Sequence, residues 1–290
     1  MRALAIVVAL GVVAGEVRAD PAPDASVGVA VTPIAPQPSL LKPERRHPLY
    51  LRLGVAFVKP LSSSNELQLA DVDGPASLAV MDGPIAGSGA TVSGATIPAL
   101  IVGVVLPWLH DRLSLETVLG TPFTVKFRAT GTLANQSIAP TALGIPTGVP
   151  ALGPELGEAT AAPPVLTAVY QLIDHGRFRP YAGLGFAMLI ATDAKMTNPI
   201  LTAVSQPKFT VDPAPGLALQ AGLDVRLSKL FYARLDVKFI ALMDAHATAE
   251  HIQVATPNIP AFGTVEVGTA KMDVMVNPLI VQAALGFDFW

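Results

Sequence analysis

The sequence contains no cysteine among its 290 residues, and only 14% of its residues are charged. The lack of cysteine excludes disulfides, thiolate metal sites and a lipid-anchored N-terminal cysteine. A soluble domain usually has about 25% charged residues, so the low charge argues against that class. The net charge of -3, with no cluster of Lys or Arg, also argues against nucleic-acid binding.

Long apolar runs are missing as well. The longest candidate, residues 96–109, is shorter than the roughly 20 residues that a membrane-spanning helix needs, and it contains Pro98 and Pro107. Yet 51% of the residues are hydrophobic, and the mean hydropathy is +0.51. Only helices and closed β-barrels satisfy every backbone group in hydrocarbon. The composition therefore favours a β-barrel.

The N-terminal part divides into two segments. Residues 1–19 carry Arg2, an apolar stretch over 3–14 and small residues near a cleavage site, which predicts a secretory signal peptide. A short membrane anchor is the alternative. Residues 20–46 are rich in Pro and Ala and predict an extended periplasmic lead-in. Residues 47–290 remain for the barrel.

Strand-like patterns recur eight times after this lead-in. The segments are 49–58, 96–107, 112–122, 163–173, 178–190, 216–227, 230–242 and 277–290. Short connections between them alternate with long ones, and the long ones cover 59–95, 123–162, 191–215 and 243–276. Outer-membrane barrels have tight periplasmic turns and long extracellular loops. The pattern predicts an all-β fold, an eight-stranded antiparallel up-and-down transmembrane β-barrel with four long extracellular loops.

Charged residues within the predicted strands follow a period of two. In FYARLDVKFIAL, residues 231–242, Arg234, Asp236 and Lys238 share one face and apolar residues occupy the other. Facing such a charge to lipid costs about 2–4 kcal/mol near the midplane, so the charges should point inward. The predicted inward-facing polar network comprises Arg52, Glu116, Asp224, Arg226, Arg234, Asp236 and Lys238. A packed structural interior is the main interpretation, and contact with a solute is the alternative.

Two strands and one connection are unusually apolar. Segment 96–107 has apolar residues on both faces and segment 163–173 nearly so, which suits a greasy solute better than a water-filled ion pore. The connection over 123–162 contains few charges. It is either a flexible loop of low complexity or an apolar rim around an entrance.

The chain resembles the outer membrane protein W (OmpW) family of eight-stranded barrels. The matching pieces occur in family order: LYLRLGVAFVKP, Gly120-Thr121-Pro122-Phe123, Pro163-Pro164, a fifth strand with Phe178, Arg179, Pro180, Tyr181, Gly183 and Gly185, and a last strand from Asn277-Pro278 to Phe289. The resemblance covers about 47–290. One departure is the C-terminal assembly signal, with Phe287 and Phe289 in phase and Trp290 one residue beyond.

This resemblance implies a function. Family members are thought to let small hydrophobic molecules pass passively through a narrow, partly apolar lumen, with lateral release into the bilayer. It further implies export through the signal peptide to the Gram-negative outer membrane, contact with lipid, lipopolysaccharide and the barrel-assembly machinery, and a monomer without cofactors. The alternative is a closed structural or surface-interaction barrel whose extracellular loops bind partners.

An enzyme is not expected, although one short stretch resembles a catalytic arrangement. His246-Ala247-Thr248 resembles the H-x-S arrangement of outer-membrane lipid A deacylases, with Thr in place of Ser. His246, Glu250 and His251 also raise the possibility of a metal site, but their spacing is not that of a zinc helix, and this stretch is expected to be a loop. No catalytic or metal-binding residue is therefore predicted.

Overall fold

The computed structural model describes residues 48–107, 109–228, 231–243 and 245–289. All of them belong to one compact unit, Pro43–Trp290. The predicted signal peptide, the whole predicted lead-in and Trp290 lie outside the described residues. Within the described part of the chain, no helix is long and apolar enough to cross a membrane.

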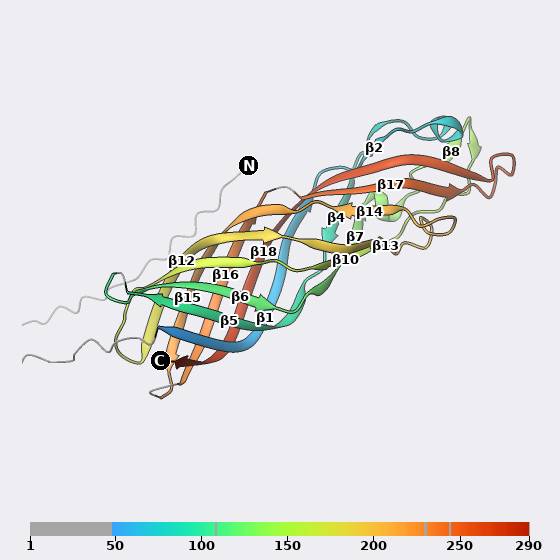
Figure 1. Cartoon of the computed structure of the whole chain (residues 1–290). Coiled ribbons are helices and arrows are strands. Elements are labelled where there is room, and N and C mark those ends of the chain that lie inside the picture. The colour runs from blue at the N-terminus through green and yellow to red at the C-terminus, as the bar shows by residue number, and fades with distance from the viewer. Residues whose placement is uncertain (1–47, 108, 229–230, 244, 290) are drawn as a thin grey trace, which may run out of the picture. The chain divides into compact units, whose positions relative to one another are not determined.

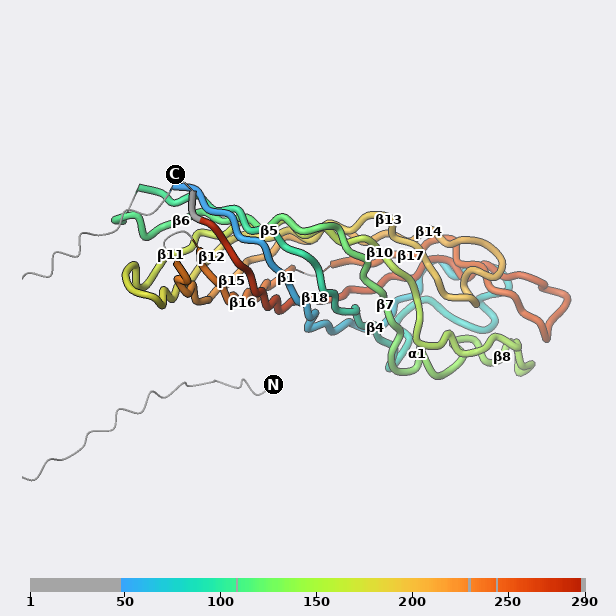
Figure 2. The backbone as a smooth tube through the Cα atoms, turned by 90° about the horizontal axis from the view of Figure 1, so that it is seen from below, coloured from blue at the N-terminus to red at the C-terminus, as the bar shows by residue number. Residues whose placement is uncertain are grey.

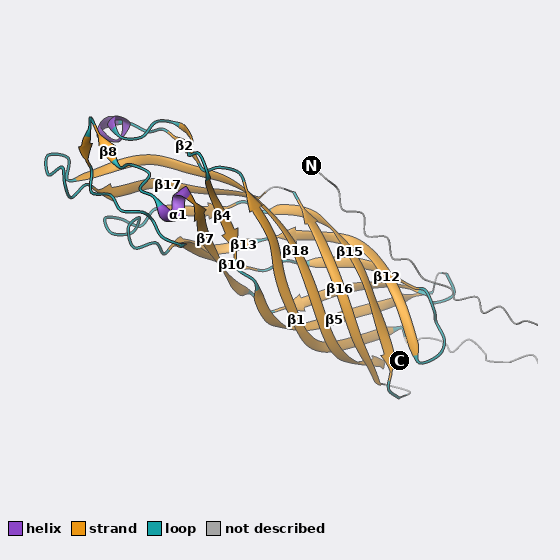
Figure 3. Cartoon of the chain, turned by 180° about the vertical axis from the view of Figure 1, so that it is seen from behind, coloured by secondary structure: helices purple, strands orange, loops and turns teal. Residues whose placement is uncertain are grey.

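Eight antiparallel strands close into a barrel (Figures 1 and 3). They are β1 (Leu49–Ser64), β5 (Ala95–Leu106), β6 (Leu113–Gly120), β11 (Val165–Gln171), β12 (Phe178–Leu189), β15 (Ala214–Arg226), β16 (Phe231–Leu242) and β18 (Thr264–Phe289). Each strand pairs with the next in this order, and β1 pairs with β18 to complete the circle. The predicted fold class is confirmed.

Side chains on the barrel strands alternate between two environments. On β1, Leu53 is 66% exposed while its neighbour Arg52 is 2% exposed. The same alternation runs along β16, where Leu235 is exposed and Asp236 is buried. Since successive strand residues point to opposite faces, the exposed apolar residues cover the outside, and the inside holds the polar residues together with a separate buried apolar cluster. This arrangement suits a barrel surrounded by hydrocarbon.

The long connections are themselves folded. Their elements are β2 (Gln68–Ala70), η1 (Gly74–Leu78), β3 (Gly83–Pro84), β4 (Ser88–Val92), β7 (Phe123–Gly131), α1 (Thr132–Asn135), β8 (Thr141–Ala142), β9 (Ile145–Pro146), β10 (Glu155–Ala161), β13 (Ala191–Met196), β14 (Lys208–Val211) and β17 (Ala245–Ala255). Together with the first half of β18, they form what we call the extension. The flexible-loop interpretation of 123–162 is wrong, because β7 and β10 pair with each other.

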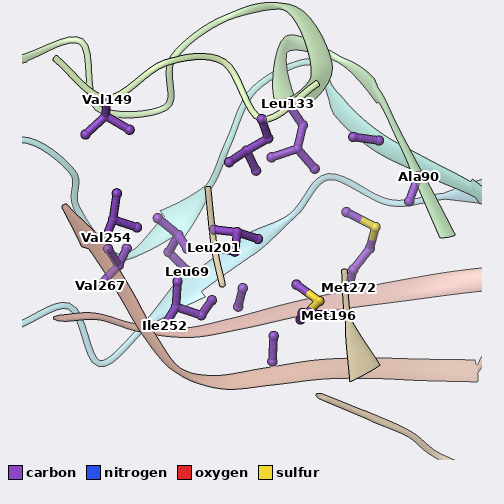
Figure 4. Packing of buried hydrophobic residues seen from close by; sticks show 14 of the residues in the cluster. Leu69, Ala90, Leu133, Val149, Met196, Leu201, Ile252, Val254, Val267 and Met272 are labelled. Carbon is purple, nitrogen blue, oxygen red and sulfur yellow. The ribbon is translucent and has the colours of Figure 1, made fainter. Parts of the chain in front are cut away.

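Two large sheets build most of the extension, and β8 and β9 pair as a small third one. One continues the barrel sheet through β18, β17 and β14, and the other has the order β13-β10-β7-β4. The sheets enclose a core of buried apolar residues that includes Leu133, Met196, Leu201 and Met272 (Figure 4). β18 runs from the extension into the barrel. It ends at the end of the barrel that lies farthest from β8, an element of the extension (Figure 2). The extension therefore has an apolar interior that continues from the barrel interior.

Candidate functional site

A network of buried charges crosses the barrel near its short turns. Arg234 on β16 is at its centre. It donates from Nε to Asp224 Oδ1 at 2.7 Å, from Nη2 to Asp224 Oδ2 at 2.9 Å and from Nη1 to Glu116 Oε1 at 2.6 Å. Arg52 on β1 donates to Asp224 Oδ2 at 3.2 Å. Tyr50 donates to Glu116 Oε1 at 2.5 Å. Four strands are thus joined by charge-assisted hydrogen bonds.

A second cluster lies toward the extension. The Lys238 ammonium donates to Asp236 Oδ1 and, at 2.6 Å, to Gln282 Oε1. Tyr181 and Gln220 each donate to Asp236 Oδ2 at 2.6 Å. Gln220 also donates to Glu116 Oε2 at 3.1 Å, which connects this cluster to the first.

The network gives each buried charge a partner of opposite sign. Buried ions are tolerated only when they are paired and hydrogen-bonded. An eight-stranded barrel is just wide enough for its side chains to fill it. The network therefore acts as a plug across the barrel, and we use that name for it below.

The structure brings together six of the seven residues expected in the network. Arg226 is not joined to them by the hydrogen bonds described above, and its Nε donates to the Ser228 carbonyl oxygen in the turn at 3.2 Å. The plug also contains uncharged residues that the pattern of charges does not predict, namely Tyr50, Tyr181, Gln220 and Gln282. Their positions in the strand alternation could have predicted them, because each lies on the inward face.

The strand that resembles the family motif supports the plug. Arg179 is buried and donates to the Tyr232 hydroxyl at 3.2 Å. Tyr181 binds Asp236 as described, and its ring lies against Arg234, with the guanidinium carbon 4.4 Å from the ring centroid. A side chain at Gly185 would place its Cβ 2.1 Å from the Leu166 carbonyl oxygen, so only glycine fits there. The neighbouring residues alternate with these two inward side chains. Phe178 is exposed, and Pro180 is partly exposed.

The predicted assembly signal is only partly described. Phe287 faces outward and packs against Phe231, with ring centroids 4.6 Å apart. The backbone of Phe289 pairs with Leu49.

Beyond the plug, cavities with mostly apolar linings lie among the described residues. The tip cavity (about 40 Å³) lies between η1 and the β17–β18 hairpin. The extension cavity (about 80 Å³) lies in the extension core. The junction cavity (about 70 Å³) lies where the extension meets the barrel. The side cavity (about 260 Å³) reaches the barrel wall.

These cavities form a series, because neighbouring ones share lining residues. The tip and extension cavities share Val149, Val254 and Val267. The extension and junction cavities share Phe127, Ala247 and Val274. The junction and side cavities share Val58, Phe123, Pro163 and Ile280. All residues that line the extension and junction cavities are apolar.

The side cavity coincides with a break in the barrel wall. The β6–β11 ladder ends at Val118 and Val165, and the β7–β10 ladder begins at Phe123 and Ala161. Between these two ladders, the described residues 119–122 form no strand pairing with residues 162–164. Pro122, Pro163 and Pro164 have no backbone N–H to donate. The sequence itself thus prevents the wall from closing here.

The histidines weighed as catalytic or metal-binding groups lie on β17, which is a strand and not the expected loop. His246 Nδ1 is 2.6 Å from Asp273 Oδ1, and His251 Nδ1 is 3.2 Å from Glu266 Oε1. Lys208 hydrogen-bonds Glu250 at 2.9 Å, and this bond and the lysine charge lower the pKa of that carboxyl. In the described part of the chain, no group of three His, Asp or Glu is arranged to hold a metal.

Comparison with known proteins identifies the family. The model of the OmpW family matches residues 50–289. The chain belongs to the OmpW family. The fold agrees: the OmpW-family chain superimposes on the crystal structure of the outer membrane protein OprG from Pseudomonas aeruginosa with a TM-score of 0.64 and 21% identity, covering 84% of this chain and 97% of OprG.

Two curated proteins are similar in sequence to this OmpW-family member. The dibenzothiophene metabolism operon protein PahQ of Pseudomonas aeruginosa is 24% identical over 62% of this chain and 67% of PahQ. The uncharacterized outer-membrane protein y4mB of Sinorhizobium fredii is 27% identical over 54% of this chain and 56% of y4mB. Family and neighbours together place the protein in the outer membrane, among β-barrel proteins.

Proposed function

We propose that this barrel lets small hydrophobic molecules pass from outside the cell into the outer membrane. A solute would enter the extension, move through the series of cavities and leave through the break in the wall. The plug would keep it from continuing along the barrel axis, so release would be lateral. The extension would face the cell exterior, and the short turns would face the periplasm.

The continuous apolar lining of the cavities carries this proposal. Neither the extension cavity nor the junction cavity has a polar side chain in its lining. Apolar surface in contact with water is unfavourable, so such a path suits a greasy solute and repels ions. The name of PahQ associates that relative with the metabolism of dibenzothiophene, an apolar aromatic compound. This is consistent with passage of such molecules.

The proposal is tested by uptake of a hydrophobic dye into vesicles whose outer leaflet contains lipopolysaccharide. Folded protein, verified by heat-dependent gel mobility, should accelerate uptake over protein-free vesicles and over vesicles with heat-unfolded protein. Equal uptake in all three preparations would overturn it.

A block inside the path gives a sharper version of this test. Ala247 lines both the extension and junction cavities, so Ala247→Phe should slow uptake. Ala182→Phe adds the same ring to the exposed outer face of β12 and should leave uptake unchanged. Equal effects of the two substitutions would argue against the cavities as the route.

A closed barrel that binds partners through its extension is the second candidate. The extension has a buried core of its own. Such a core holds the outer surface in one conformation, and a binding partner would need that. This candidate predicts no effect of folded protein on dye uptake. The proposed contacts with lipid, lipopolysaccharide and the assembly machinery, and the proposed monomeric state, are common to both candidates.

A further inference from the structure

The side cavity combines apolar walls with one polar corner. Most of its lining is apolar, including Ile97, Val118, Phe123 and Ile280. At its inner end it meets Lys238 and Gln282, the plug residues nearest to the extension. Both side chains are almost fully buried from outside solvent, at 1% and 2% exposure. A few polar groups that converge on an otherwise apolar cavity are typical of ligand-binding pockets.

Gln282 has an amide nitrogen to spare. Lysine can only donate hydrogen bonds, so the bond with Lys238 uses the oxygen of the Gln282 amide. This orientation leaves Nε2, with two N–H donors, as the other end of the amide. Among the described residues, no hydrogen-bond partner accepts from Gln282 Nε2. Gln282 Nε2 is not among the fully buried polar atoms that lack a hydrogen-bond partner. This nitrogen is therefore accessible, and it borders the open cavity.

Lys238 adds a second donor at the same corner. Its ammonium has three N–H groups, and two of them are used by Asp236 and Gln282. The charge of Lys238 is balanced by Asp236, with which it forms a salt bridge. The corner therefore offers hydrogen-bond donors without an unbalanced positive charge. A neutral oxygen acceptor suits it, whereas a carboxylate would be repelled by Asp236.

We propose that the side cavity is a binding site for small apolar molecules that carry one neutral acceptor oxygen, such as an alcohol, a phenol or a ketone. The oxygen binds Gln282 Nε2 and Lys238 Nζ, and the apolar body lies along Ile97, Phe123 and Ile280. A dry cavity of about 150 Å³ holds benzene, so about 260 Å³ has room for one or two rings.

This inference names the solute class for the route given under Proposed function, on which it builds. It also predicts that the solute pauses beside the break in the wall. An oxygenated molecule is held there by its polar end, while a plain hydrocarbon is not. The site thus discriminates by a polar contact within an otherwise apolar path, as ligand pockets commonly do.

The test compares equilibrium binding of 1-naphthol and naphthalene to the folded protein in nanodiscs, with empty nanodiscs subtracted. The two probes share a ring system and differ by one hydroxyl. We expect the wild type to bind 1-naphthol more tightly, and to bind 1-naphthoate no better than naphthalene. In glutamine-labelled protein, 1-naphthol should shift the NMR signals of the Gln282 side-chain amide and naphthalene should not.

Two substitutions separate the donor from the stability of the plug. Gln282→Leu removes the whole amide, whereas Gln282→Glu keeps an acceptor for Lys238 and replaces the amide donor by a carboxylate oxygen, which also adds a negative charge. Both should weaken 1-naphthol binding by about three- to tenfold, the effect of one hydrogen bond, and leave naphthalene binding unchanged. Gln171→Leu is the matched control, since Gln171 is also a buried barrel glutamine but does not line the cavity.

Unchanged 1-naphthol binding in both Gln282 variants would overturn the inference, as would an equal loss for both probes. The binding test is independent of transport. If the variants lose 1-naphthol binding but wild-type protein does not accelerate dye uptake, the binding site stands and the proposed conduit fails.

Discussion

Arg234 and Asp224 form a two-pronged ion pair across neighbouring strands of the barrel, with N–O distances of 2.7 and 2.9 Å. They are direct partners in the β15–β16 register. Arg234 extends the contact to Glu116, whose chain position is 118 residues away. The pair therefore connects local strand pairing to the closure of the whole barrel.

Removal of Arg234 should destabilise the barrel strongly. Arg234→Leu leaves Asp224 and Glu116 buried with less compensation, which costs about 3–5 kcal/mol when a buried pair is broken. Urea unfolding in lipid vesicles, followed by gel mobility, measures the change. Lys208→Leu breaks the exposed pair with Glu250 and should have little effect. Comparable losses in both variants would show that the plug contributes no special stability.

The two glycines of the family-motif strand should respond differently to substitution. A Cβ at Gly185 would lie 2.1 Å from the Leu166 backbone oxygen, whereas at Gly183 the nearest atom is 3.1 Å away. Gly185→Ala should therefore cost about 1–3 kcal/mol of stability through overpacking, and Gly183→Ala less. The same unfolding measurement applies, and a larger loss for Gly183→Ala would contradict the described packing.

The extension core should be needed for a folded extension but not for a folded barrel. Leu133 is 1% exposed, whereas Leu143 is 77% exposed. Leu133→Ala should destabilise the extension by about 2–5 kcal/mol through cavity formation and speed protease cleavage within 123–161. Leu143→Ala should not. Equal cleavage of the two variants would indicate that the extension is not packed as described.

One turn outside the membrane-spanning segments should show a small pH dependence. The hydrogen bond from His175, followed by those from the backbone and Arg112, lowers the pKa of Asp174. Because the folded protein lowers this pKa, the contribution of Asp174 is present above the unfolded value of about 3.9 and is lost as pH falls through the folded value.

For this exposed pair the contribution is at most about 1 kcal/mol. Urea midpoints of the wild type and Asp174→Asn between pH 2 and 7 measure it. The wild type should be slightly more stable at pH 6, and the difference should vanish at the acidic end. A difference that grew on acidification would have the wrong sign.

The barrel was predictable from the sequence because its signal is local. The period of two in 231–242 is enough to place Arg234 inside and Leu235 outside, whatever the neighbouring strands do. The alternation of long and short connections then specifies an up-and-down order. The strand bounds agree with expectation except that β1 and β18 continue beyond the barrel.

The extension and the polar corner were not predictable because they depend on distant pairings. Residues 245–255 are rich in Ala, which has little strand preference, and become β17 only by pairing with β18. Lys238 and Gln282 meet although 44 residues separate them. Alternation places each inside the barrel, but only the register of β16 and β18 brings them together.

The lateral route is the central claim, and the cysteine-free sequence allows a direct test of it. Thr121→Cys introduces a single thiol into the lining of the side cavity, which a bulky maleimide can then block. Ala182→Cys, on the exposed face of β12, is the labelled control. We predict that labelling slows hydrophobic dye uptake severalfold in Thr121→Cys and leaves Ala182→Cys unchanged. Full labelling at position 121 with undiminished uptake would contradict release through the break in the wall.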